Sequence, residues 1–83
     1  MNKNELKTKL NLLVVDPQAY SLEGELIPDS IVLFNSYHDW VVFYLDERGG
    51  RNDEKVFASE NEACTYIYNL FKESKKIEKK YLK

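Results

Sequence analysis

Cysteine, proline and long apolar runs are all scarce in this chain of 83 residues. The single cysteine, Cys64, has no second thiol for an internal disulfide and no cysteine or histidine at metal-ligand spacing, which argues against disulfide redox chemistry and structural zinc. No stretch approaches the roughly 20 consecutive apolar residues of a membrane span. Charged residues near the N-terminus also interrupt the apolar centre that a secretory signal needs, so we expect a cytoplasmic protein with no membrane association.

The charged residues are unevenly distributed, although the formal net charge is only -2. Residues 11–62 hold eleven acids against three bases, whereas the segments on either side carry an excess of lysine. An acidic surface repels phosphate, attracts a cationic partner and accelerates their association at low salt. The alternative interpretation is a solvated surface that serves only solubility.

The N-terminal segment predicts a helix with the i, i+4, i+7 spacing of an amphipathic face. Its apolar positions are Leu6, Leu10 and Leu13. Asn4 is the expected N-cap, and the helix should end before Pro17. The turn-rich segment that follows leaves room for only a brief strand around residues 20–22.

The middle of the chain predicts an antiparallel meander of strands. "SIVLFNS" alternates two apolar faces, the stretch from Trp40 to Glu47 is rich in β-branched and aromatic residues, and "EKVFAS" returns after a turn at Gly49 and Gly50. In the strand that begins at Trp40, the alternation sets the wholly apolar positions against those with polar tips. We assign Val41, Phe43 and Leu45 to the face that helices cover, and Trp40, Val42 and Tyr44 to the outer face.

The C-terminal segment predicts one long helix. Ser59 is the expected N-cap, and Glu62 completes a capping box with it. The apolar stripe recurs at spacings of four and three: Ala63, Ile67, Leu70, Ser74, Ile77 and Tyr81. Because lysines crowd residues 74–83, we expect this part to project past the sheet as a basic helical extension.

These elements predict a single α+β domain over residues 1–83. It would hold an N-terminal helix, a three- to four-stranded antiparallel meander, and a long C-terminal helix packed on one face of the sheet. One apolar face of a small sheet can serve both helices, which leaves the other face partly open.

The residues that could carry catalysis form no recognisable constellation. His38 and Asp39 are neighbours in sequence and would point apart, and no nucleophile stands in an activating motif. Cys64 is expected to be a small buried side chain, with a reactive thiol as the minor alternative. Arg48 and Arg51 lie among the carboxylates of the glycine turn, which favours cross-strand ion pairs over a metal site. We therefore expect no enzyme, no cofactor and no metal.

Nucleic acid is an alternative partner, because the element order is also that of double-stranded RNA-binding domains. The second helix of those domains begins with lysines that contact phosphate, whereas here Glu60 and Glu62 occupy the corresponding place. Nucleic-acid binding is therefore disfavoured, and would depend on the basic C-terminal helix. The same helix would suit an adaptor that pairs with another helix, although we expect a monomer rather than a dimer.

The segment "WVVFYLDERGGRNDEKVFASENEACTYIYNLF" resembles small bacterial immunity proteins of polymorphic-toxin and contact-dependent growth inhibition systems. The likeness lies in an aromatic strand, a turn, a return strand and an acidic-capped helix, at Glu47, Arg48, Gly49, Phe57, Glu62, Ala63 and Cys64. The upstream "DPQAYSLEGEL" is also similar, and the two segments cover about half of the chain. The resemblance implies a non-catalytic protein that binds and neutralises a cognate toxin domain, commonly a nuclease.

A partner-binding surface follows from this resemblance together with the acidic and aromatic residues. Carboxylates can occupy a nuclease site in place of phosphate, and aromatic anchors slow dissociation. The expected partner-binding residues are Tyr37, His38, Asp39, Trp40, Tyr44, Asp46, Glu47, Asp53 and Glu54. The alternative interpretation is core packing for Trp40 and Tyr44 and solubility for the carboxylates.

Overall fold

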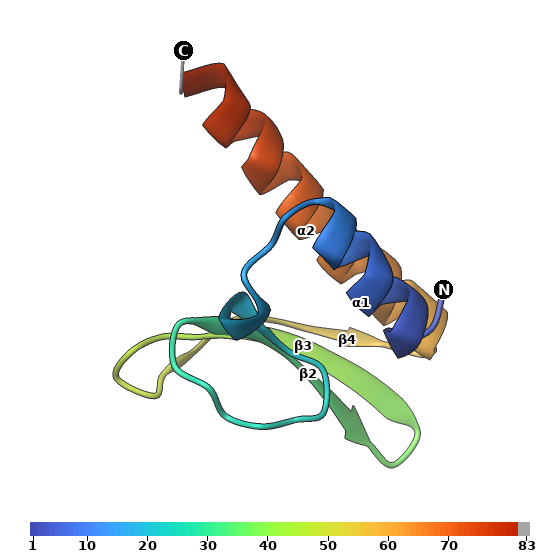
Figure 1. Ribbon diagram of the computed structural model, residues 1–83. Coiled ribbons are helices and arrows are strands. Elements are labelled where there is room, and N and C mark those ends of the chain that lie inside the picture. Colours follow the sequence, from blue (N-terminus) through green and yellow to red (C-terminus); the bar gives the residue numbers. More distant parts are fainter. Residues whose placement is uncertain (82–83) are drawn as a thin grey trace.

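A computed structural model of the protein describes the backbone of residues 1–81 and the side chains of residues 1–75. Two helices cover one face of a four-stranded sheet (Figure 1). In chain order the elements are α1 (Lys3–Leu12), the short 3-10 helix η1 (Pro17–Ala19), β1 (Tyr20–Ser21), β2 (Ser30–Ser36), β3 (Asp39–Leu45), β4 (Arg51–Phe57) and α2 (Glu60–Tyr81). The predicted α+β class and the order of its helices and strands are confirmed.

Helix α1 begins earlier than predicted. Asn2 is the N-cap, and its side chain accepts a 2.9 Å hydrogen bond from the backbone N–H of Glu5, so the choice of Asn4 was wrong. Two asparagines so close together are equivalent caps in sequence, and only the backbone geometry distinguishes them. Leu6 and Leu10 are fully buried, as the spacing predicted.

The sheet has the strand order β1-β2-β3-β4, and its first pair is parallel. The predicted antiparallel arrangement holds for β2 with β3 and for β3 with β4, but not for the short β1. The segment 22–29 between β1 and β2 passes on the side of the sheet away from the helices (Figure 1). There Gly24 lies so close to Phe34 that an added Cβ would be 3.2 Å from the ring. This route returns the chain to the end of the sheet where β1 began, so the two strands run in the same direction.

The faces of β3 are the reverse of our assignment. Trp40 and Val42 pack into the main core with α1 and α2, so the expected outward orientation of Trp40 is wrong. Phe43 and Leu45 form a second, smaller cluster with Val32 on the opposite face.

A charged residue explains why the large apolar side chain of Phe43 can lie on the face that no helix covers. The guanidinium of Arg51 lies over the Phe43 ring, 4.5 Å from its centroid, and Phe43 is only 1% exposed. On the other face, the smaller side chain of Val42 allows α2 to approach, with Ala63 and Ile67 buried in the same core. Alternation in the sequence identified the two sets of side chains on opposite faces of β3. Which set meets the helices is decided by the groups that cover each face, Arg51 on one and α2 on the other.

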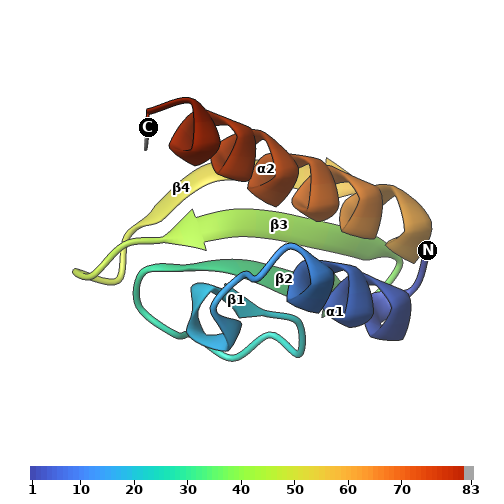
Figure 2. The same cartoon turned by 45° about the horizontal axis from the view of Figure 1, so that its top comes forward.

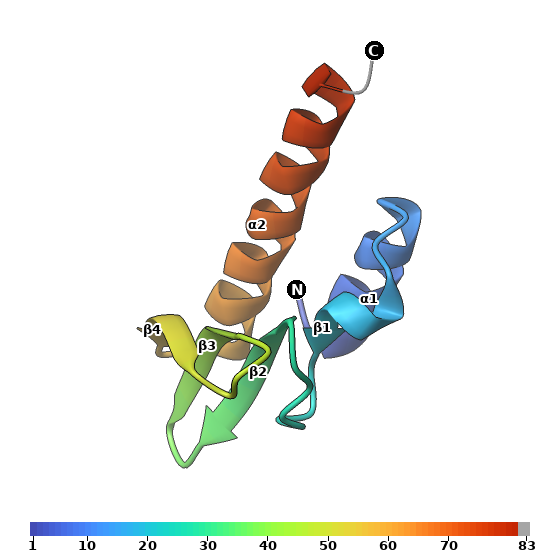
Figure 3. The same cartoon turned by 90° about the vertical axis from the view of Figure 1, so that its left-hand side faces the viewer.

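Helix α2 begins at the predicted cap. The backbone N–H of Glu62 donates to Ser59 Oγ at 3.2 Å, which is one half of the predicted capping box. The helix lies along β3 and β4, with α1 beside it (Figure 2). Its C-terminal end stands clear of the sheet (Figure 3). The side chains of Ile77, Tyr81 and the last lysines lie outside the described residues.

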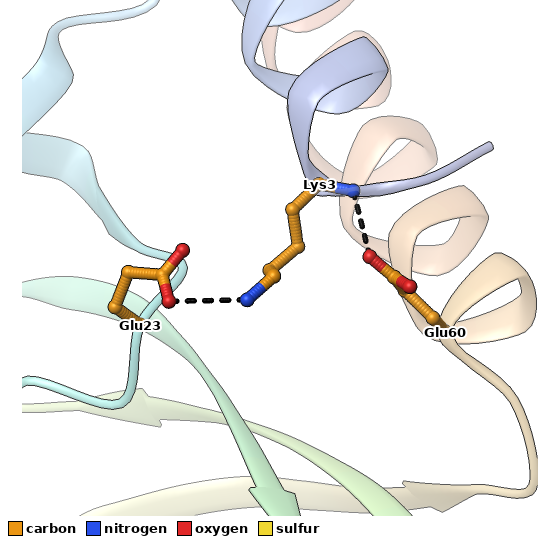
Figure 4. Close-up of polar contacts among 3 residues, drawn as sticks. All are labelled: Lys3, Glu23 and Glu60. Carbon is orange, nitrogen blue, oxygen red and sulfur yellow. Dashed lines mark hydrogen bonds and ion pairs between the residues drawn. The ribbon is translucent and has the colours of Figure 1, made fainter.

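Lys3 connects the starts of both helices to the segment after β1 (Figure 4). Its backbone N–H donates to Glu60 Oε2 at 2.9 Å, and its Nζ forms an ion pair with Glu23 Oε2 at 3.0 Å. Glu60, which in the sequence argues against phosphate binding, therefore also has a structural role between α1 and α2.

Candidate functional site

The turn between β3 and β4 is organised by the side chain of Asp46. Its carboxylate accepts hydrogen bonds from the backbone N–H of Gly50 at 2.7 Å and of Arg48 at 2.9 Å, and from Asn52 Nδ2 at 3.1 Å. These donors, Gly50 and then Asn52 foremost, lower the pKa of Asp46 below its ordinary value. Asp46 thus holds the shape of the turn, a role that the sequence analysis did not foresee for it.

Further carboxylates gather at this end of the sheet around the hydroxyl of Tyr44. That hydroxyl donates a 2.8 Å hydrogen bond to Asp29 Oδ1. The bond to Asp29 raises the pKa of Tyr44, and the negative charges of Asp46 and Glu47 act in the same direction. Tyr44 is half-buried on the helix side of the sheet, so its expected outward orientation is wrong, while its polar tip does meet the acidic residues.

Asp29 is a member of this group that the sequence analysis missed. Its backbone N–H donates to the carbonyl of Leu45 at 2.8 Å, so it lies beside the last residue of β3. The signal was available, because a tight turn at Tyr37 and His38 fixes the register of β2 on β3 and places residue 29 near residue 46.

A β-bulge in β4 places Asp53 and Glu54 in different environments. Between the pairs Val42↔Lys55 and Tyr44↔Asn52, β4 contains one residue more than β3. Asp53 adopts a positive φ of 53° and is one of the residues that line a groove beneath α2. Glu54 instead forms an ion pair with Arg51 at 3.7 Å.

The groove beneath α2 has a volume of about 190 Å³. It lies on the helix side of the sheet, below the middle of α2. The described residues that line it belong to the sheet and to α2: Ile31, Val42, Phe43, Tyr44, Asp53, Lys55, Tyr66 and Leu70. The groove is therefore apolar along its length and charged where it reaches β4.

The remaining predicted residues lie at the other end of β3. Tyr37 and His38 form the turn between β2 and β3, where Tyr37 is 98% exposed and has a positive φ of 54°. Asp39 is exposed at the start of β3, and Trp40 is half-buried in the core. Since the seven residues of β3 span about 20 Å, the nine predicted residues do not form one surface.

A basic cluster lies on the two helices. Lys9 of α1 and Lys72 of α2 both approach the ring of Tyr68, with their Nζ atoms 5.4 Å and 5.8 Å from its centroid. Such positions allow cation–π attraction and bring the positive charges of both helices together. The acidic end of the sheet and this cluster therefore give the molecule two regions of opposite charge.

Groups for metal binding do not assemble in the part of the chain that the structure describes. No three His, Cys, Asp or Glu side chains among these residues are placed to hold a metal ion. Cys64 is fully buried, and burial, with a smaller effect of Glu60, raises the pKa of its thiol to about 11. No described helix combines the length and apolar character needed to cross a membrane.

Comparison with known proteins gave no match to a family model, to a curated protein or to a solved structure.

Proposed function

We propose that this protein is a non-catalytic immunity protein that binds and neutralises a cationic toxin domain, with a nuclease as the expected target. The observation that carries the proposal is the gathering of Asp29, Asp46 and Glu47 around Tyr44 at one end of the sheet. A nuclease attracts phosphate through basic side chains, and a group of carboxylates competes for the same side chains.

The fixed shape of the acidic end supports this role. The carboxylate of Asp46 is held by three hydrogen bonds within the turn, and the ring of Tyr44 is held by its bond to Asp29. Groups that are already ordered lose less conformational entropy when a partner binds. The turn thus presents its charge in one arrangement before the partner arrives.

The proposed surface differs from the one that the sequence predicts. It consists of Asp29, Tyr44, Asp46, Glu47 and Asp53, with Glu54 at its margin through the ion pair to Arg51. Trp40 is assigned to the core instead. Tyr37, His38 and Asp39 form a separate contact, which only a partner long enough to span β3 would reach.

The first experiment captures partners of the tagged protein from a lysate of its own host, at low and moderate salt, with identification by mass spectrometry. A stoichiometric toxin domain is the expected result, with weaker capture at the higher salt. The affinity for that domain is then measured for the double variant Glu47→Gln/Asp53→Asn. We expect at least a tenfold loss, because both carboxylates lie on the proposed surface.

The matched control is the double variant Glu25→Gln/Glu73→Gln, which removes the same charge from exposed positions elsewhere. It should bind as the unaltered protein does. Equal losses in both double variants would mean that only the net charge matters, and no loss in the first would contradict the proposal.

The second candidate function is a nucleic-acid-binding or adaptor module that uses the basic helices. The observation that favours it is the convergence of Lys9 and Lys72 on Tyr68. Fluorescence anisotropy with a short RNA duplex tests the first version. Binding that weakens steeply with salt and is lost in Lys9→Gln/Lys72→Gln would favour this function over the immunity function.

A further inference from the structure

We propose that the groove beneath α2 binds a lysine or arginine side chain of the partner protein. This inference rests on the proposed function for the identity of the partner as a cationic protein. It adds the place on this chain where one basic side chain of that partner is held.

The walls of the groove suit the alkyl stem of such a side chain. Val42 on the floor is 1% exposed, whereas Leu70 of α2 is 36% exposed although it is apolar. Long basic side chains bury their methylene groups against apolar surfaces of this kind and keep the charged group near water. Covering Leu70 in this way would remove apolar surface from water.

The carboxylate of Asp53 provides the negative charge that pairs with the cationic end of the partner's side chain. The bulge in β4 gives it a left-handed backbone and brings it to the groove, while the next residue, Glu54, is paired with Arg51. Bulges often redirect a side chain next to a binding site. In the described part of the chain, no ion pair satisfies Asp53.

The other charges around the groove also favour a cation. Tyr44 lines the groove, and its hydroxyl is bonded to Asp29, with Asp46 and Glu47 nearby. Among the described residues of the lining, Lys55 is the one that is basic, and its side chain is exposed at the edge of the sheet. The described lining thus holds one carboxylate and one ammonium group, and the further carboxylates near the hydroxyl of Tyr44 tilt the balance toward a cation.

Aromatic groups add a further preference for cations. Tyr66 lines the groove from the helix, and its ring is held by stacking on Phe57, with 5.1 Å between the centroids. A guanidinium or ammonium group is attracted to the face of a tyrosine ring. The apolar wall thus suits the alkyl stem of an arginine or lysine side chain, and the tyrosine ring and the Asp53 carboxylate suit its charged end.

The test uses n-butylguanidinium as the probe and n-butylurea as its neutral isostere, in an NMR titration of the whole protein. With n-butylguanidinium we expect saturable shifts that are centred on Val42, Tyr66 and Leu70, with a dissociation constant in the millimolar range. The neutral isostere should bind at least threefold more weakly. Equal binding of the two probes, or shifts centred elsewhere, would overturn the proposal.

Two variants with the same change of charge locate the effect. Asp53→Asn should weaken binding of n-butylguanidinium at least threefold, whereas Glu25→Gln, at an exposed position outside the groove, should leave it unchanged. Asparagine accepts the left-handed backbone of position 53, so we expect the variant to fold, which circular dichroism checks. Unchanged binding in Asp53→Asn would overturn the proposal.

The titration tests the groove and the capture experiment tests the immunity function, so either proposal can fail without the other. Capture of a cationic toxin by a protein whose groove ignores the probe would refute the groove and leave the immunity function in place. A groove that binds the probe in a protein that captures no toxin would support the cation site and contradict the immunity function.

Discussion

The hydroxyl of Tyr44 at the end of β3 donates a 2.8 Å hydrogen bond to Asp29, the residue that precedes β2. The bond lies at the end of the sheet where the carboxylates gather. It also links the groove to the acidic turn, because Tyr44 belongs to both. Its strength can be measured directly through the ionisation of the phenol.

Asp29→Asn should lower the pKa of Tyr44 toward the ordinary value of 10.0, because the hydrogen bond to the Asp29 carboxylate, the main cause of its rise, becomes a weaker bond to a neutral amide oxygen. A raised pKa means that the folded protein holds the proton more tightly than the unfolded chain. Its contribution to stability is therefore present below pH 10 and is lost as the pH rises further.

NMR of the Tyr44 ring carbon that bears the hydroxyl measures this titration. Asn is suited to position 29, where φ is 60°, so the fold should be retained. An unchanged pKa in the variant would contradict the assigned bond.

Replacement of each glycine of the β3–β4 turn by alanine should perturb the protein for a different physical reason. Gly49 has a φ of 85° with open space around it, so Gly49→Ala should cost about 1 kcal/mol through backbone strain alone. A Cβ on Gly50 would instead lie 2.7 Å from Asp46 Oδ2, so Gly50→Ala must displace the carboxylate.

The pKa of Asp46 separates the two cases. Displacement in Gly50→Ala should raise it toward its ordinary value of 3.8, whereas Gly49→Ala should leave it lowered. Because a lowered pKa stabilises the fold above the ordinary value and this contribution disappears as the pH falls, Gly50→Ala should also weaken the acid dependence of stability. NMR of the Asp46 carboxyl carbon tests this, and equal pKa values in both variants would argue against it.

Cys64 should react slowly with thiol reagents while the protein is folded. A pKa of about 11 in place of 9.0 leaves about a hundredfold less thiolate at pH 8, and full burial slows access further. The rate of reaction with a chromogenic disulfide, in buffer and in denaturant, measures the difference. Rapid labelling of the folded protein would indicate the reactive thiol that the buried position argues against.

Tyr37→Gly should leave the free energy of unfolding within about 0.5 kcal/mol of the original value. The variant relieves the strain of a positive φ at a non-glycine residue, and loses a comparable amount through the greater freedom of glycine in the unfolded chain. Tyr37 is 98% exposed, so little packing is lost. Denaturant titration measures the change, with Tyr37→Ala, which keeps the strain, as the control. A loss of several kcal/mol would mean that the ring packs in the folded protein.

The elements of the fold were predictable because the local signals agree with the final structure. The spacing of Leu6 and Leu10, the alternation in β3 and the cap at Ser59 all depend on residues within one or two turns of each other. The direction of β1 could not be predicted in this way, because it follows from the route of the segment 22–29, in which Gly24 lies close to Phe34.

The main error of the prediction was the choice of the sheet face that meets the helices, and two residues of β3 show its cause. Phe43 is wholly apolar and was assigned to the helices, while Trp40 has a polar atom and was assigned to the solvent. A distant basic side chain, Arg51, covers Phe43, and the ring of Trp40 packs into the main core. Periodicity reports that two side chains are on opposite faces, but the covering groups come from other strands.

The candidate site was predictable as a region but not as a set of contacts. The acidic turn was identified from its composition, whereas the internal bonds of Asp46 and the participation of Asp29 depend on backbone geometry. The different environments of Asp53 and Glu54 arise from a bulge that nothing in the local sequence specifies.

The bulge in β4 has a consequence for the outer edge of the sheet. β4 has a neighbour on one side only, and such an edge can template the addition of further strands. A second copy laid along it would have to match the bulge at Asp53. The strand thus discourages fibre growth when many copies crowd together.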